Sequence, residues 1–508
     1  MRTMHEAVAS VNGEQLLEQV REMVGYVEQS VEAGRAAHEV EKALWNWVLA
    51  LGRQALGMFF RLCGDGDEGQ WVISAEGRRL RRLEALHPRD YQSVFGRFRL
   101  ERVVYGTRET QKIEYAPLDA RLELPQSVFS YLLQDWDQSL AQEMAFAQVS
   151  TLMAKMLGFE QSVHSLERTD RKLSEAVAAF WEAQPVPPAE QEGGLLVCTA
   201  DSKGVPMRRG APQARIEGAR PSKGVRPGGK KMALLGSVYT VEAHLRTPQE
   251  VLEALFHPPG TDSKPVPRRP QPCFKRVRAG LLRDAAESTQ PQLQAIFGWM
   301  AQEVARRDPQ GTKPLVLVMD GEETLWKAGL KHLPESRFEV TEVLDLLHAS
   351  SYLWQAASLF HPPDSPQSLP WVKQQLGLLL EGKVNTVIEA LRRQGTVLSA
   401  QRQQALEGIC GYFEHHAHRM AYDEYLAAGY PIASGVIEGA CRCVVNDRME
   451  RSGMRWVLEG AHAMLGLRSI SLSGLWEEFM AFRIAQESER LYPHRAANDP
   501  DMNFACAA

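Results

Sequence analysis

The pattern of the chain changes at a short segment rich in proline, glycine and glutamate, residues 184–194. Before it, apolar residues recur mostly at helical spacings; after it, short β-prone apolar runs alternate with helical stretches. Strands that alternate with helices build a layered α/β fold, whereas the earlier part favours helices. The 508 residues have room for about three domains, and we place a linker at 184–194.

The part of the chain before this linker is predicted to form two regions. Residues 1–88 are expected to be a helical region, because apolar residues recur at spacings of four and three within residues 14–60, before a turn at Gly64–Asp67. Members of this series are Leu16, Val20, Val24, Val27 and Val31. Residues 89–183 start with a predicted β-hairpin over 91–105, in which Gly96 and Arg97 form the turn.

A helix, a glycine turn and a second helix are predicted within residues 149–173. The second helix is rich in basic residues, which suits the DNA-reading helix of a helix-turn-helix. The candidates for DNA contact on it are Arg168, Arg171 and Lys172. A solvated helical hairpin would show the same pattern, so both interpretations stay open.

Beyond the linker, five short runs of apolar, β-prone residues predict five strands. These runs cover residues 195–199, 232–241, 273–281, 314–319 and 338–344. Strands interleaved with helices indicate an α/β domain, which we assign to residues 195–348. Residues 349–430 are predicted to be helical, residues 431–492 to add a second part of the α/β domain with a helix from Ser434, and residues 493–508 to be a weakly ordered tail.

Three acidic residues occupy positions where open α/β sheets bind ligands. Asp201 and Asp320 each follow an apolar run, and Glu438 lies in the first turn of the helix after Ser434. Each residue alone could equally be a turn or helix-capping acid, and Glu438 could pair with Arg442 one turn later. If the three carboxylates meet, their repulsion raises at least one pKa, and divalent cations would relieve it.

The residues around these acids resemble bacterial insertion-sequence DDE transposases of the ISKra type. The similarity rests on TADSKGVPM at 199–207, LGSVYT at 235–240, VMDGE at 318–322, and SGVIEG at 434–439 with SGMRW at 452–456. It covers most of the chain and implies an RNase H-like catalytic core with an all-α insertion at 349–430. Related proteins often carry a cysteine-bearing knuckle after the hairpin; residues 105–115 have no cysteine, so we expect no metal there.

The resemblance also implies a chemistry. Asp201, Asp320 and Glu438 would be catalytic and would bind two Mg²⁺ ions, for which Mn²⁺ could substitute. The enzyme would hydrolyse a phosphodiester at the end of the element, and the freed 3′ hydroxyl would then attack target DNA. Asp345 and His348 resemble an acid-x-x-His pattern and are secondary candidates; a helix N-cap followed by a packed histidine is the alternative.

Local basic clusters are compatible with the net charge of −5, which argues only against a uniformly basic protein. Residues 203–231 hold nine Lys and Arg against one acid, and another cluster lies near 264–278. The predicted DNA contacts are Lys203, Arg208, Arg209, Lys230, Lys231, Arg268, Arg269, Arg448, Arg451, Arg455 and Trp456. Solvated loops are the alternative for the first two clusters, but their position beside the proposed site favours phosphate contact. For the last four residues, packing and ion pairing are the alternative.

The sequence therefore predicts a DNA transposase that binds terminal inverted repeats and catalyses strand cleavage and strand transfer. Its partners would be double-stranded DNA, both element ends and target, and further copies of the chain in a homodimer or larger assembly. The alternatives are an RNase H-like nuclease without strand transfer and a domesticated, catalytically silent DNA-binding protein. Seven scattered cysteines argue against a zinc ribbon and for free thiols. Without a signal pattern or an apolar run of the ~20 residues that span a bilayer, we expect no membrane partner and a cytoplasmic, nucleoid-associated location.

Overall fold

The computed structural model describes residues 2–74, 76–107, 113–208, 229–256, 269–282, 290–333, 339–451 and 453–493. The chain divides into two units, which we call the N-terminal unit (Met1–Ala176 with Glu477–Ala508) and the sheet unit (Val177–Trp476). The boundary between the units, after Ala176, comes before the expected linker at 184–194, because the linker segment packs into the sheet unit. There, the carbonyls of Gln184 and Pro185 accept hydrogen bonds from Arg306 and Arg276.

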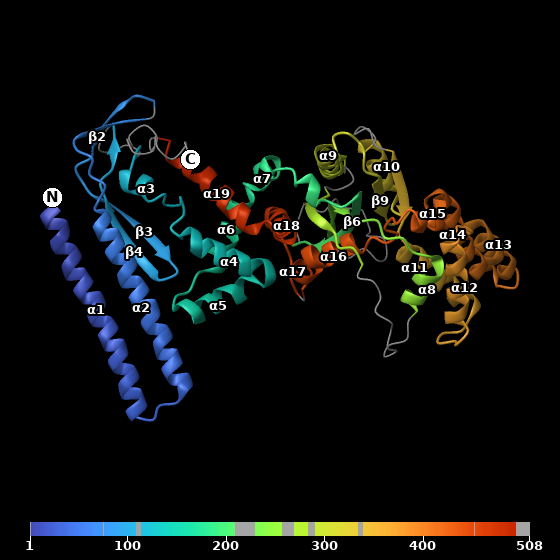
Figure 1. The fold of residues 1–508 in the computed structure, drawn as a ribbon, viewed down its shortest axis with the longest axis horizontal. Coiled ribbons are helices and arrows are strands. Elements are labelled where there is room, and N and C mark those ends of the chain that lie inside the picture. The colour runs from blue at the N-terminus through green and yellow to red at the C-terminus, as the bar shows by residue number, and fades with distance from the viewer. Residues whose placement is uncertain are drawn as a thin grey trace, which may run out of the picture. The chain divides into compact units, whose positions relative to one another are not determined.

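The N-terminal unit begins with two long helices, α1 (Arg2–Glu32) and α2 (Ala37–Cys63), which lie side by side (Figure 1). The predicted hairpin is present as β3 (His87–Ser93) and β4 (Gly96–Arg102). Its turn lies two residues earlier than expected, because Gly96 already pairs with Ser93 and adopts a φ of +118°, which suits glycine. A separate small sheet contains β1 (Trp71–Ile73), β2 (Arg79–Arg82) and β5 (Tyr105–Gly106). The last part of the region expected to be helical, residues 1–88, therefore contains strands, which depend on pairing with the distant β5.

Helices complete the N-terminal unit: α3 (Pro117–Arg121), α4 (Tyr131–Glu143), α5 (Phe146–Leu157), α6 (Val163–Ser174) and α19 (Trp476–Leu491). The predicted helix, glycine turn and helix are confirmed as α5, Gly158 and α6. Gly158 ends α5 with a φ of +75°, and the Ser162 hydroxyl caps α6. From Glu477 on, α19 belongs to this unit, although the sequence grouped it with the α/β domain.

The sheet unit is built on a five-stranded mixed sheet with the order β10-β9-β6-β7-β8. Its strands are β6 (Leu195–Pro206), β7 (Lys230–Val241), β8 (Cys273–Leu281), β9 (Leu315–Met319) and β10 (Val340–Leu344), close to the five predicted runs. β6, β7 and β8 are antiparallel neighbours, and β9 and β10 run parallel to β6. β6 is longer than predicted because β7 pairs with it as far as Pro206, beyond the last β9 pair at Ala200.

Helices cover both faces of this sheet. On one face, α9 (Gln290–Arg307) and α10 (Glu323–His332) bury residues such as Phe297 and Trp326 against Leu196 and Leu317. The other face contributes Val197, Val316 and Val318 to a core shared with the helices that follow β10. These helices are α11 (Leu346–Phe360), α12 (Ser368–Leu380), α13 (Val384–Gly395), α14 (Ala400–His416) and α15 (Tyr422–Ala427). α8 (Pro248–Leu255), which precedes β10 in the chain, contributes Leu252 to the same core. The predicted helical character of 349–430 is confirmed.

The last part of the sheet unit contains an irregular helix. α16 (Gly435–Cys441) passes into a π-helical turn, Arg442–Asn446, and then into the short α17 (Asp447–Met449), before α18 (Leu458–Leu472). In the π turn, the N–H of Asp447 reaches the carbonyl of Arg442, five residues back. Arg468 of α18 donates to the carbonyl of Cys443, 3.1 Å away, and satisfies a polar group within this turn. Across the described residues, no helix combines the length and apolarity needed to cross a membrane.

Candidate functional site

Asp201 lies on β6 just after the pairing with β9 ends, so it sits within the strand and not at its end as predicted. The backbone N–H of Ser202 donates to its Oδ1 at 2.6 Å, and the Cys441 thiol of α16 donates to the same carboxylate. Burial raises the pKa of Asp201. The two hydrogen bonds oppose this rise, the charge of Asp320 adds to it, and Lys203 lowers the pKa again.

Asp320 directly follows β9, as predicted, and a second acid lies close to it. The N–H of Glu322 donates to the Asp320 Oδ1 at 3.0 Å, and the indole of Trp326 donates to the Asp320 carbonyl at 2.6 Å. The Glu322 carboxylate accepts a hydrogen bond of 3.0 Å from the Ser202 hydroxyl on β6. Burial raises the pKa of Glu322, and the charges of Asp320 and Asp201 raise it further. From the sequence, Glu322 was noted only as part of the motif at 318–322, and its position beside Asp320 and Asp201 was not predicted.

Glu438 approaches the same carboxylates from α16. Its pKa is raised first by partial burial and then by the charges of Asp345 and Asp201, whereas His348 and Lys203 lower it. Asp201 therefore interacts electrostatically with both Asp320 and Glu438. The structure brings the three predicted acids, which are remote in sequence, into one neighbourhood at the end of β9.

Asp345 is buried and joins two helices of this neighbourhood. Its Oδ1 accepts from the N–H of His348 at 2.8 Å and so caps α11, which is the geometry of the helix-cap alternative. Its Oδ2 accepts from the N–H of Ser434, the residue before α16. Asp345 thus fixes where the helix of Glu438 begins. The His348 ring contacts Tyr352 edge-on, with 5.6 Å between centroids.

A tyrosine from the helical segment after β10 also reaches this neighbourhood. Tyr412 of α14 stacks on Tyr352 with ring centroids 3.8 Å apart. Its buried hydroxyl has no hydrogen-bond partner in the described part of the chain. A Cβ placed on Gly321 would lie 2.7 Å from this hydroxyl, so glycine permits the close approach. Burial raises the pKa of Tyr412, and the charges of Asp320 and Asp345 add to the rise.

Carboxylate oxygens are the donors that Mg²⁺ prefers, so the residues gathered around Asp201 fit this metal chemically. Their arrangement is more open than a finished metal site. Within the described ranges, no three His, Cys, Asp or Glu side chains are placed to hold one ion together. Asp201, Asp320 and Glu438 therefore share a neighbourhood without forming a closed set of ligands in this conformation.

The basic residues predicted to bind DNA separate into groups. Lys203 acts on Asp201 and Glu438 and so belongs to the acidic neighbourhood. Lys230 is exposed and forms an ion pair with Glu450. Further predicted contacts that are exposed or half-exposed are Arg168, Arg171, Lys172, Arg208, Lys231, Arg269, Arg451 and Arg455. Arg209 and Arg268 lie outside the described residues.

Arg448 and Trp456 do not fit the predicted role in DNA contact. Arg448 is only 1 % exposed, its guanidinium lies 4.9 Å from the centre of the Trp456 ring, and Trp456 is itself buried. The backbone of Trp456 bonds to the end of β6, through the Pro206 carbonyl at 3.0 Å and the Arg208 N–H at 2.8 Å. Arg448 and Trp456 therefore connect the segment after Glu438 to β6. The prediction that they contact DNA is corrected: they are packing residues.

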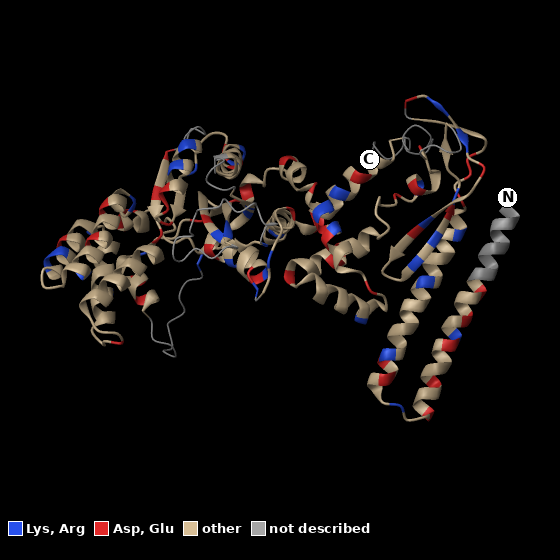
Figure 2. Cartoon of the chain, turned by 180° about the vertical axis from the view of Figure 1, so that it is seen from behind, with Lys and Arg blue, Asp and Glu red and all other residues tan. Residues whose placement is uncertain are grey.

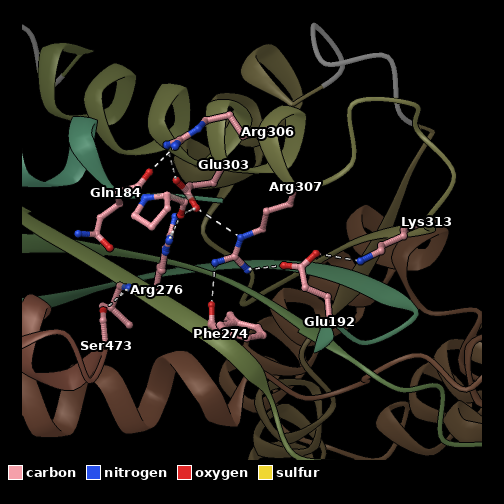
Figure 3. A network of polar contacts seen from close by, with 11 residues as sticks. Gln184, Glu192, Phe274, Arg276, Glu303, Arg306, Arg307, Lys313 and Ser473 are labelled. Carbon is pink, nitrogen blue, oxygen red and sulfur yellow. Dashed lines mark hydrogen bonds and ion pairs between the residues drawn. The ribbon is translucent and has the colours of Figure 1, made fainter. Parts of the chain in front are cut away.

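A buried ion network links β8 with α9 and includes Arg276 from the second basic cluster (Figure 3). Glu303 of α9 accepts from Arg276 at 2.8 Å and pairs with Arg307 at 3.4 Å. Arg307 continues the network to Glu192, which also pairs with Lys313 at 2.9 Å. Arg276 cannot make the phosphate contact that was considered for this cluster, because it is buried and its charge is compensated by Glu303.

A basic cavity of about 410 Å³ lies in the N-terminal unit and was missed by sequence reasoning. Four exposed arginines line it, two from α2 and two from β4: Arg53, Arg61, Arg97 and Arg99. Arg97 pairs with Asp90 at 2.5 Å, and Arg99 lies 3.3 Å from Glu101. Arg53 and Arg61 have no carboxylate partner among the described residues. Figure 2 shows basic residues along both α2 and the hairpin.

No family model and no curated relative matches the chain. Among solved structures, it is similar to the "Drosophila P element transposase strand transfer complex", with 11 % sequence identity and a TM-score of 0.24. That alignment covers 74 % of this chain and 94 % of the other. A similarity of this size establishes neither a common fold nor a common activity, so the resemblance drawn from sequence motifs stays a prediction.

Proposed function

We propose that the protein is a DNA transposase of the DDE type whose sheet unit is an RNase H-like catalytic domain. The observation that carries the proposal is the position of Asp201, which interacts with Asp320 from β9 and with Glu438 from α16. The mixed sheet is compatible with such a domain. Asp201 lies on its central strand, β6, and Asp320 directly follows the neighbouring strand, β9. Carboxylates gathered with little positive charge around them are expected of a site that binds divalent cations.

Each group in this neighbourhood has a defined task in the proposal. Asp201, Asp320 and Glu438 would hold divalent metal, which would supply activation of the attacking oxygen and stabilisation of the departing one. Glu322 adds negative charge and orients the Ser202 hydroxyl. Asp345 is a positioning residue, because it fixes the start of α16 through Ser434. No side chain is needed as a nucleophile, so alignment and charge stabilisation are the contributions of the protein.

The proposal is tested on the full chain with a duplex that carries the inverted repeats flanking its gene, in Mg²⁺ or Mn²⁺. Asp201→Asn and Glu438→Gln should abolish both cut and joined products. Glu389→Gln, an exposed acid on α13, is the matched control and should keep both activities. Variants at Asp201 and Glu438 that cut and join like wild type would falsify the mechanism. Cleavage without joined product would indicate the nuclease alternative, and binding without cleavage the silent DNA-binding protein.

DNA binding by the N-terminal unit is a second part of the proposal, and the arginine-lined cavity supports it. Guanidinium groups match phosphate geometry, and Arg53 and Arg61 are not engaged by carboxylates in the described residues. Each phosphate contact contributes about 0.9 to the slope of log K against log salt. Arg53→Gln with Arg61→Gln should therefore lower that slope by about 2, whereas Arg393→Gln, an exposed arginine on α13, should not.

A further inference from the structure

α1 presents two different faces along its length. Where it lies along α2, the covered or half-covered positions are Leu16, Gln19, Met23, Tyr26 and Ser30, a mixed polar and apolar set. The neighbouring face is purely apolar over five positions: Leu17, Val20, Val24, Val27 and Val31. These five side chains, which we call the valine stripe, are 36–77 % exposed. The most apolar face of the helix is therefore the one that the described residues leave uncovered.

The spacing of the valine stripe is that of a coiled coil. Its members follow one another at intervals of three, four, three and four residues, so Leu17, Val24 and Val31 take the a positions of a heptad and Val20 and Val27 the d positions. Isolated exposed apolar residues are common, but a continuous stripe at this spacing is typical of a helix that packs against another helix. No strand edge or flat groove would match a repeat of 3.5 residues.

We propose that a second copy of the chain covers the valine stripe, through an antiparallel coiled coil of the two α1 helices. The charges beside the stripe favour this occupant. Arg21 and Glu28 both take the e position, seven residues apart. In an antiparallel pair, e positions face each other, so Arg21 of one copy lies opposite Glu28 of the other. The two-fold symmetry of such a dimer repeats this contact, and its interface is self-complementary.

A parallel pair would not make these contacts. Its e positions would face g positions, which hold Leu16, Met23 and Ser30 and offer no charge to Arg21 or Glu28. The present ion pair of Arg21 with Glu18 is exposed at both side chains and contributes little, so Arg21 can change partner. The dimer needs neither metal nor DNA, so the inference goes beyond the proposed function and can fail independently of it.

The test is sedimentation velocity on the full chain without DNA or divalent metal. Wild type should be a dimer, and Val24→Glu should raise the dimer dissociation constant by roughly a hundredfold, because each change occurs twice in the interface. Val397→Glu, which replaces a more exposed valine of the sheet unit, is the matched control and should stay dimeric. A monomeric wild type, or a Val24→Glu variant that dimerises like wild type, would overturn the inference.

The charge pattern tests the orientation with variants that leave the apolar stripe intact. Arg21→Glu should weaken the dimer, and adding Glu28→Arg to it should restore wild-type association, because the pair is then reversed. Circular dichroism of each variant checks that helix content is retained. A double variant that associates no better than Arg21→Glu alone would exclude the antiparallel arrangement.

Discussion

Two groups of carboxylates in the sheet unit differ in how their charge is compensated. In the ion network that links β8 with α9, Glu303 and Glu192 are buried, and four basic side chains surround them: Arg276, Arg306, Arg307 and Lys313. At the end of β9, Asp201, Asp320, Glu322 and Glu438 lie together, and Lys203 and His348 are the basic groups that act on Asp201 and Glu438. The first group holds β8, α9 and the preceding segment together. The second group is a concentration of negative charge that the fold does not neutralise, as expected of a functional site.

The largest expected effect is on the matched network. Glu303→Gln would leave Arg276 and Arg307 buried without their shared carboxylate, and should lower the free energy of unfolding by about 3–5 kcal/mol. Urea unfolding of the full chain measures this loss. Glu407→Gln is the control, because it removes an exposed pair with Arg392 and should cost about 0–1 kcal/mol. Equal losses in the two variants would contradict the structural role of the network.

Asp137, a buried acid of the N-terminal unit, tests whether every buried carboxylate without a basic partner belongs to a functional site. Burial raises the pKa of Asp137 to about 8, and the charges of Asp135 and Asp170 add to the rise that hydrogen bonds from Gln138 and Gln161 oppose. The folded state therefore keeps a proton that the unfolded chain loses near its ordinary pKa of 3.8. Stability from this group is complete below that pKa and is lost as the pH rises toward 8.

Asp137→Asn should remove this pH dependence. Urea unfolding at a series of pH values should show that the free energy of unfolding of the variant, relative to wild type, increases as the pH rises. The increase should be on the order of a few kcal/mol at the alkaline end. Glu160→Gln, at an exposed position of the same unit, is the control and should follow the wild-type curve closely. A constant difference between Asp137→Asn and wild type across the range would refute the raised pKa.

A smaller effect is expected at the acidic neighbourhood itself. Because the fold raises the pKa of Asp201, ionised Asp201 destabilises the folded state, and Asp201→Asn should be neutral or should stabilise by up to about 1 kcal/mol in metal-free buffer. The asparagine oxygen can still accept from the Ser202 N–H. A loss as large as that of Glu303→Gln would mean that Asp201 is a structural residue.

The smallest effect concerns Cys441, whose hydrogen bond lowers the pKa of Asp201. Cys441→Ala should raise that pKa further, because the donor is lost while burial persists. Carbon-13 titration of labelled aspartates, with Asp201→Asn to assign the signal, measures the shift. Cys441→Ser keeps a donor and should return the pKa toward the wild-type value. An unchanged pKa in the alanine variant would show that the thiol makes no such contact.

Much of the sheet unit follows from local sequence pattern. Apolar runs of the right length predicted all five strands, because buried strands need uninterrupted apolar residues. The place of Asp320 after β9 follows in the same way. The end of β6 could not be read locally, since β7 extends it beyond Asp201 through pairing that depends on a partner strand.

The parts of the site that escaped prediction depend on contacts between distant segments. Nothing near Tyr412 in the sequence marks it, and it reaches Gly321 only because α14 packs beside the sheet. Arg448 looked like a phosphate ligand because it is basic, but Trp456 folds back to the end of β6 and covers it. Residue type predicts what a side chain can do, and tertiary packing decides whether solvent or DNA can reach it.

The π turn at Arg442–Asn446 has an evolutionary consequence. Each residue of a regular α-helix rotates the chain by about 100°, so one extra residue changes which neighbours the two ends of the helix can address. The turn lets Glu438 face β6 while Arg448 faces Trp456. A one-residue deletion there would restore a regular helix and rotate Glu438 or Arg448 away from its present partner. In evolution, a change of length should therefore be tolerated less readily at this turn than in exposed loops.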